Sequence, residues 1–170
     1  DPGDSILAAE VAAVRRLVAR LDARYTRVSL VTFAGRLLDA GILDPDQAVT
    51  ELALTTTYED LQRALDRVLA RGAEGATNMA AGVDQATREL LGLRGAFSKT
   101  DPRSQRIAVF LTDGVPTLPF PNDEARNTKA VEKAAARARL AGIRVFPYGI
   151  GAEALAGPLA LVDLAHATDA

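Results

Sequence analysis

The chain has 170 residues, 48% of them hydrophobic and 25% charged, which is typical of one globular domain with a substantial core. Its formal net charge of −2 gives no electrostatic reason to expect nucleic acid or an anionic membrane surface as a partner. Cysteine is absent, which excludes disulfides and thiolate metal sites but leaves the compartment open. No apolar run approaches the length of a membrane span, so we expect no membrane insertion by this segment.

The first predicted elements are a helix and two strands. Apolar residues recur at helical spacing over Leu7–Leu21, which predicts an amphipathic helix with one buried stripe. Val28–Phe33 is rich in β-forming residues and predicts a strand that Gly35 ends. Gln47–Thr55 alternates loosely and predicts an edge strand.

Two further helices are predicted in the middle of the chain. Thr57 and Asp60 resemble a capping box in front of the amphipathic segment Leu61–Leu69. Gly72–Gly75 ends this helix because the two glycines of this segment favour a turn. Met79–Leu90 then carries apolar residues on one face and predicts a third helix.

The second half of the chain continues the alternation of strands and helices. Ile107–Leu111 is a continuous apolar run, which predicts a strand buried on both faces of a parallel sheet. A helix through Val131–Ala138, a strand at Arg144–Tyr148 and a helix at Leu159–Ala167 follow. This order predicts an α/β fold with a doubly wound, mostly parallel sheet and helices on both faces.

Two oxygen-bearing side chains are candidates for a cation site. Asp113 directly follows the buried strand, at the sheet edge where open α/β folds bind ligands, although Asp-Gly is also a common turn pair. Thr77 is either a hydroxyl ligand or the N-cap of the third helix. Together they favour Mg²⁺, Mn²⁺ or Ca²⁺ over Zn²⁺, although two ligands are too few to hold such an ion unaided.

Other chemical motifs are weak or absent, and nothing argues for catalysis. Gly149–Ala154 matches the relaxed dinucleotide pattern G-x-G-x-x-A, but too little chain follows for the required strand and acidic residue, so a turn is the better interpretation. His166 is the single histidine and has no nucleophile pattern around it, so we expect a structural or surface role. The sequence contains no P-loop and no HExxH motif. We expect no catalytic residue.

Four segments together resemble a von Willebrand factor type A domain. They are Val28–Gly35 (VSLVTFAG), Gly75–Ala86 (GATNMAAGVDQA), Arg106–Thr117 (RIAVFLTDGVPT) and Ala141–Gly151 (AGIRVFPYGIG), in the family's order and over most of the chain. The resemblance implies a Rossmann-like doubly wound sheet with an antiparallel edge strand. It also implies a binding module for adhesion or protein interaction rather than an enzyme, and it slightly favours an extracytoplasmic or cell-surface location.

The resemblance further implies a metal-ion-dependent adhesion site. In this family an Asp-x-Ser-x-Ser loop, a threonine and a second aspartate hold a divalent cation, and the partner protein supplies a carboxylate to its open position. Thr77 matches the threonine and Asp113 the second aspartate, with Mg²⁺ as the expected ion and Mn²⁺ or Ca²⁺ as alternatives. On position alone, the rim that a partner touches comprises Asn78, Gly114, Val115, Pro116 and Thr117.

The Asp-x-Ser-x-Ser motif is where the sequence departs from the family. Asp1, Gly3 and Ser5 have the spacing of a degenerate version, but the preferred interpretation places Asp1–Ser5 in a loop after the true motif. With either interpretation, the family order implies that a central strand is missing between Val28–Phe33 and Ile107–Leu111, as is a strand after the last helix. We therefore expect residues 1–170 to be a single domain that is part of a longer chain.

Three functional hypotheses remain at this stage. The first is a metal-dependent module that binds a protein ligand through an acidic side chain. The second is a metal-free scaffold domain of the same fold in a larger assembly. The third is a hydrolase or nucleotide-binding enzyme on a similar sheet, which would need a nucleophile, base or phosphate loop that the sequence does not offer.

Overall fold

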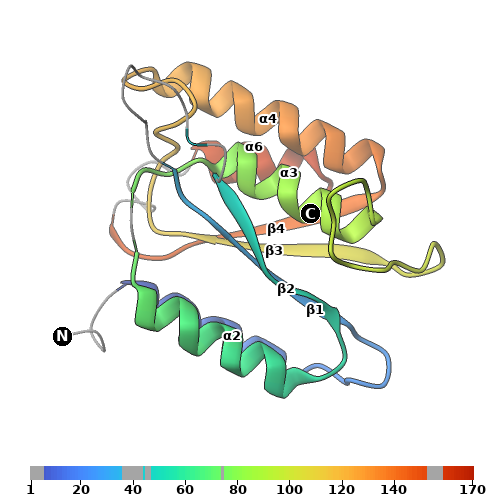
Figure 1. The fold of residues 1–170 in the computed structure, drawn as a ribbon. Helices are drawn as coiled ribbons and strands as arrows, with labels where there is room; N and C mark the ends of the chain where they lie inside the picture. The colour runs from blue at the N-terminus through green and yellow to red at the C-terminus, as the bar shows by residue number, and fades with distance from the viewer. Residues whose placement is uncertain (1–5, 36–43, 45–46, 74, 153–158) are drawn as a thin grey trace.

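A computed structural model describes residues 6–35, 44, 47–73, 75–152 and 159–170 of the chain. Strands form a middle layer with helices on both sides, as Figure 1 shows. This arrangement confirms the predicted α/β class. The elements are α1 (Ile6–Val18), β1 (Val28–Phe33), β2 (Ala48–Thr55), α2 (Tyr58–Arg71), α3 (Met79–Leu91), β3 (Arg106–Thr112), α4 (Glu124–Leu140), β4 (Ile143–Gly149) and α6 (Leu159–Ala167).

The described strands form two separate pairs. β1 pairs with β2 in antiparallel fashion, from Val28 opposite Thr55 to Phe33 opposite Ala48, with a bulge in between. β3 and β4 pair in parallel, in unbroken register from Arg106 with Ile143 to Thr112 with Gly149. The antiparallel edge strand β2 is therefore confirmed. Within the described residues no ladder joins β1 to β3, although the two strands are neighbours in space.

Two apolar clusters hold the layers together. One lies between the β3–β4 pair and helices α3, α4 and α6, and contains Val83, Phe110, Val131 and Val145. The other lies between α1, α2 and the β1–β2 pair. Phe33 of β1 and Phe110 of β3 stack with ring centroids 4.6 Å apart, so an aromatic contact connects the two strand pairs, which share no ladder within the described residues.

Two local predictions are corrected by the structure. Thr57 stands at the N-cap of α2, but its side chain makes no capping hydrogen bond, and Asp60 pairs with Arg63 instead of completing a capping box. The strand around Ile107–Leu111 is not buried on both faces, since Ile107 and Val109 remain 43% and 39% exposed. The helices that cover this strand pack on its other face, which carries Phe110.

Candidate functional site

Three backbone segments meet at the carboxyl ends of β1 and β3. Ala76 N–H donates to Gly35 C=O just after β1, and Thr117 N–H donates to Thr77 C=O just beyond β3, at 2.6 and 3.0 Å. Thr77 N–H donates in turn to the Thr117 hydroxyl at 2.8 Å. The loop before α3 therefore ties the two strand ends together, so β1 and β3 run in the same direction and end at the same edge.

Close packing of the backbone fixes the position of this loop. Gly75 has φ +83°, and a Cβ at this position would lie 2.4 Å from the Gly35 carbonyl oxygen. Glycine is required here both for the left-handed backbone and for the contact with Gly35. The position of Thr77 thus depends on a glycine two residues earlier.

The structure decides between the two interpretations of Thr77. Asn78, not Thr77, is the N-cap of α3, and its side-chain oxygen accepts a hydrogen bond from Ala81 N–H at 3.1 Å. The side-chain amide of Asn78 also donates to Gln47 at 3.4 Å. The Thr77 hydroxyl is not used for capping and makes no hydrogen bond within the described part of the chain. It is therefore available to a ligand at the strand edge.

Asp113 is the second oxygen-bearing residue at this edge. Its side chain is exposed and forms no hydrogen bond or ion pair with any described residue. The turn that carries it is stabilised by its neighbours, since Gly114 N–H donates to the Thr112 hydroxyl and Ile150 N–H to the Thr112 carbonyl, at 3.5 and 2.9 Å. The Asp113 carboxylate thus keeps its full capacity for an external cation.

Glu10 of α1 adds a second carboxylate that the sequence analysis did not identify. Burial raises the pKa of Glu10 to about 7, and the negative charge of Asp113 adds to the shift. Glu10 follows Leu7 by three residues and precedes Val11 and Val14, so it interrupts the apolar face of α1. An acidic residue within a buried stripe was the available signal, because such a position has to be compensated by chemistry nearby.

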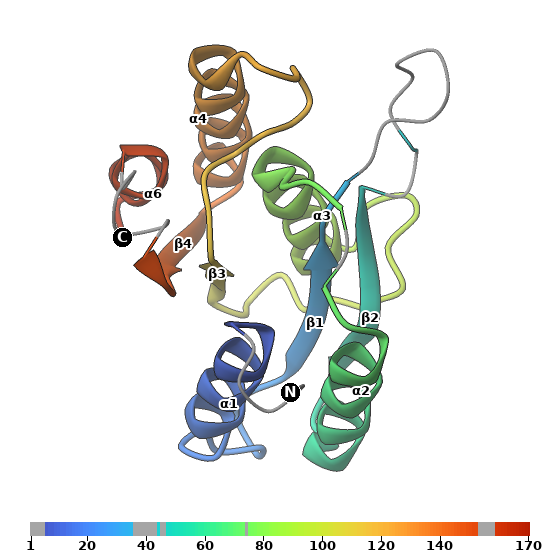
Figure 2. The ribbon, with the colours of Figure 1, turned by 90° about the vertical axis from the view of Figure 1, so that its left-hand side faces the viewer.

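A large cleft separates β1 from β3. Its volume is about 1220 Å³, and residues of α1, α2, β1, α3 and β3 line it. The apolar side chains of Val11 and Val14 face it from one side, and Glu10, Thr77 and Asp113 line its end at the carboxyl edge. In Figure 2 the ribbons of β1 and β3 run side by side, with α1 below them. Each of the two strands has one edge without a ladder partner among the described residues.

The candidate rim residues differ in their exposure. Thr117 is exposed and Val115 is partly buried, so both are reachable from solvent at this edge. Asn78 is 4% exposed, and Gly114 and Pro116 are also buried. These three lie within the loops, so Val115 and Thr117 offer the larger surface at this edge. The role at the rim remains a prediction for all five residues.

The remaining sequence motifs lie away from this edge or outside the description. Gly151 has φ +96°, as expected for the predicted turn after β4, while the rest of the G-x-G-x-x-A segment extends into residues that the structure does not describe. His166 is exposed on α6, in agreement with a surface role. Asp1–Ser5, the possible degenerate motif, lies outside the described residues.

Comparison with known proteins identifies the family. A family model for the von Willebrand factor type A domain matches residues 3–167. The chain belongs to this family. No curated protein matches the chain.

Two solved structures share the von Willebrand A fold with this chain. The conserved hypothetical protein BatB from Bacteroides thetaiotaomicron is 18% identical, with a TM-score of 0.61, and the match covers 96% of this chain and 76% of that one. An aerotolerance-related membrane protein from Bacteroides fragilis NCTC 9343, with multiple mutations to serines, is 17% identical, with a TM-score of 0.66, and the match covers 96% and 77% of the two chains. At these identities the likeness shows the fold alone.

Membership places this chain among domains that serve as protein-interaction modules, are generally not enzymes and often bind a divalent cation. The residues of this chain at the strand edge have the right ligand chemistry for such an ion, but the described ones are too few to hold it. Thr77 and Asp113 supply oxygen ligands, as hard cations require. In the described part of the chain, however, no three His, Cys, Asp or Glu side chains gather into a group that would hold a metal ion. In the same part of the chain no helix is long and apolar enough to cross a membrane.

Proposed function

We propose that this domain binds a protein partner through a divalent cation, held at the carboxyl edge by Thr77 and Asp113 and completed by a carboxylate of the partner. The observation that carries the proposal is that a hydroxyl and a carboxylate line the same cleft and that neither side chain has a hydrogen-bonding partner among the described residues. Because Asn78 caps α3, capping does not explain the hydroxyl of Thr77. Mg²⁺ suits the all-oxygen ligands best, with Mn²⁺ or Ca²⁺ as close substitutes.

The remaining cation ligands come, in this proposal, from a strand that fills the cleft between β1 and β3. On both sides the cleft is lined by strands that have one edge without a partner in the described part of the chain, and apolar residues of α1 flank it, so an extended apolar segment fits it. A strand parallel to β3 would end beside Asp113 and bring its next residues to the same edge. We propose that the domain is part of a longer chain that supplies this strand ahead of α1.

A metal-free scaffold is the second candidate function. It is favoured by the small number of acidic groups near Asp113 in the described residues, which by themselves do not form a metal site. The two functions differ in one respect that is easily measured, because only the first requires the ion. One fold neighbour is named a membrane protein, and an extracytoplasmic location is part of our proposal on that ground alone.

Calorimetric titration of the full-length protein with Mg²⁺ and Mn²⁺ tests the proposal. We expect saturable binding that Asp113→Ala abolishes and Thr77→Ala weakens. Asp101→Ala is the matched control, since Asp101 is an exposed aspartate in the loop that leads into the opposite end of β3. Equal binding by wild type and Asp113→Ala would overturn the metal site, and no binding by the wild type would leave the scaffold function.

A further inference from the structure

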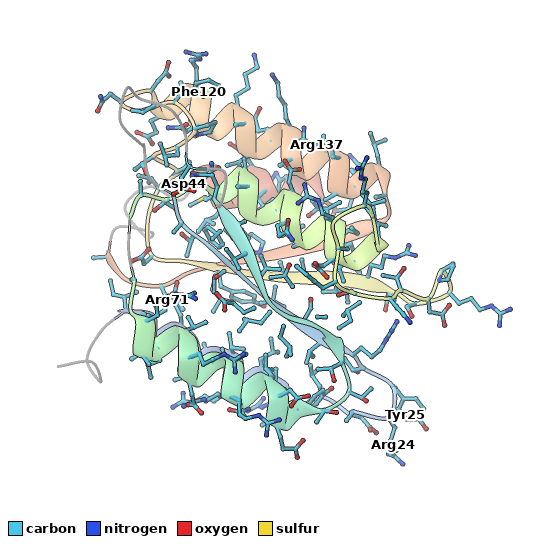
Figure 3. All side chains as sticks on the ribbon, viewed as in Figure 1. Arg24, Tyr25, Asp44, Arg71, Phe120 and Arg137 are labelled. Atoms are coloured by element: carbon cyan, nitrogen blue, oxygen red, sulfur yellow. The ribbon has the colours of Figure 1, made fainter. Side chains whose placement is uncertain are left out.

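A groove between α3 and α4 carries a row of positive charges. Its volume is about 460 Å³, and one wall is formed by Arg126, Lys129, Lys133 and Arg137 of α4. Figure 3 labels Arg137 on α4 and, towards the other end of the row, Phe120. These cations recur every three or four residues, which places them along one side of the helix.

Two of the four cations have partners within the fold. The Arg137 guanidinium binds both carboxylate oxygens of Asp84 on α3, at 2.7 to 3.0 Å. The Arg126 guanidinium lies 3.8 Å from the centroid of the Phe120 ring and 3.8 Å from a carboxylate oxygen of Asp123. These contacts position the two arginines and neutralise part of their charge.

The two lysines between them have no partner among the residues that the structure describes. Lys129 and Lys133 are exposed, and neither side chain forms an ion pair or hydrogen bond within the described part of the chain. Among the described residues, Asp84 is the one acidic residue that lines the groove, and Arg137 neutralises it. The groove is therefore positive on a chain whose net charge is −2, so its charge is a local feature and not a reflection of overall composition.

The dimensions of the groove fit a short length of polypeptide. The helical rise places Arg126 and Arg137 about 16 Å apart along α4, a span that about five residues cover in extended conformation. Ala80, Ala81 and Ala130 also line the groove, and their small side chains let a backbone approach closely. Nucleic acid is disfavoured because a phosphate backbone needs a broad basic surface, whereas this chain is acidic overall.

We propose that the α3–α4 groove binds an acidic polypeptide segment, whose carboxylates pair with Lys129 and Lys133. This inference rests on the proposed function, in which the partner is a protein that supplies a carboxylate, and it adds a second surface that the same partner contacts. Asn78, which lines the groove, directly follows Thr77, so the groove lies next to the proposed cation site and one partner can reach both. Binding in the groove itself requires no cation.

Fluorescence anisotropy with the full-length protein tests this groove. The probe is a fluorescein-labelled peptide of about eight alternating Glu and Ala residues, long enough to span the row. It is titrated in EDTA, so that no metal site contributes. Lys129→Glu/Lys133→Glu is expected to weaken binding about 10- to 30-fold and to remove most of its salt dependence, because two attractive charge pairs become repulsive.

The charge-matched control is Lys99→Glu/Arg103→Glu, in the exposed loop before β3, which is expected to change the affinity less than about twofold. Lys129→Ala/Lys133→Ala gives a milder variant, and circular dichroism verifies its folding. Unchanged binding by the α4 variants would refute the inference, as would equal weakening by the control. The inference would also be overturned if single-stranded DNA or phosphatidylserine vesicles bound more tightly than the peptide and lost affinity in the α4 variants to the same extent.

The same assay separates this inference from the proposed metal site. Repeating the titration in Mg²⁺ with Asp113→Ala reports only the contribution of the cation. If Mg²⁺ increases the peptide affinity of the wild type but not of Asp113→Ala, while the α4 variants bind the peptide normally in EDTA, the groove alone is refuted. If the α4 variants lose binding in EDTA, while Mg²⁺ has the same effect on the wild type and on Asp113→Ala, the cation site is refuted and the groove is retained.

Discussion

Replacing Glu10 by glutamine is expected to stabilise the protein at neutral and alkaline pH. Glu10 is partly buried at the end of the cleft and faces the charge of Asp113. Burial, with that charge as the smaller cause, raises its pKa from 4.5 to about 7. Glutamine has nearly the same shape as the protonated carboxyl group, so it removes the ionisation cost while keeping the packing.

The sign and the size of the effect follow from the two pKa values. Between pH 4.5 and 7 the folded protein retains a proton on Glu10 that the unfolded chain has released, so stability falls as the pH rises through this range. The full shift corresponds to about 3 kcal/mol. Because Glu10 keeps some contact with solvent, we expect about 1–2 kcal/mol.

Urea unfolding at pH 5 and pH 8 measures this difference. The free energy of unfolding of Glu10→Gln should be close to that of the wild type at pH 5 and should exceed it at pH 8. Glu132→Gln, which removes an exposed charge from the middle of α4, should show no such change with pH. In the Asp113→Asn background the gain should shrink, because one of the two causes of the shift is gone. A stability difference that is the same at both pH values would refute the reasoning.

Two further predictions concern the support of the site. Glu89 is fully buried and accepts hydrogen bonds from the Phe97 and Ser98 N–H groups and from the Ser98 and Thr50 hydroxyls; burial alone raises its pKa, but these bonds outweigh burial and lower it. Glu89→Gln places its side-chain NH2 group against a buried backbone N–H, so we expect the free energy of unfolding in urea at pH 7 to fall by about 2–4 kcal/mol. This difference from the wild type should become smaller as the pH falls below the ordinary carboxyl pKa. A loss under about 0.5 kcal/mol at pH 7 would contradict this account. Gly75→Ala should destabilise the protein more than Gly72→Ala, because both glycines have φ +83° but only Gly75 would place a Cβ against Gly35; equal melting temperatures would contradict the role of that contact.

The sequence was informative wherever local periodicity determined the element. Val28–Phe33 and Leu159–Ala167 were predicted with their observed bounds, and the remaining predicted elements with shifts at their ends. Apolar spacing and glycine breaks suffice for such elements, because each buries one stripe or one face. The same reasoning failed for Ile107 and Val109, because a continuous apolar run does not show which neighbours cover each face of a strand.

The functional edge was predictable only in part. Thr77 and Asp113 were recognisable because they follow a glycine loop and a buried strand, and they line one cleft in the structure. The capping role of Asn78 was not, since threonine and asparagine both serve as N-caps and only the backbone geometry decides between them. Two other features join residues more than fifty positions apart in the sequence, and no local pattern can predict such contacts. They are the proximity of Glu10 to Asp113 and the ion pair between Arg137 and Asp84.

The cleft and the candidate cation site depend on the same few backbone contacts. The loop that holds Thr77 joins β1 and β3 at their carboxyl ends, while no ladder of described residues joins them along their length. In the proposed function, a strand that enters the cleft pairs with both edges and fixes the separation of the segments that carry Thr77 and Asp113. A cation bound by these residues stabilises that same separation. Because such coupling is reciprocal, the ion should strengthen strand binding by the same factor by which the strand strengthens ion binding.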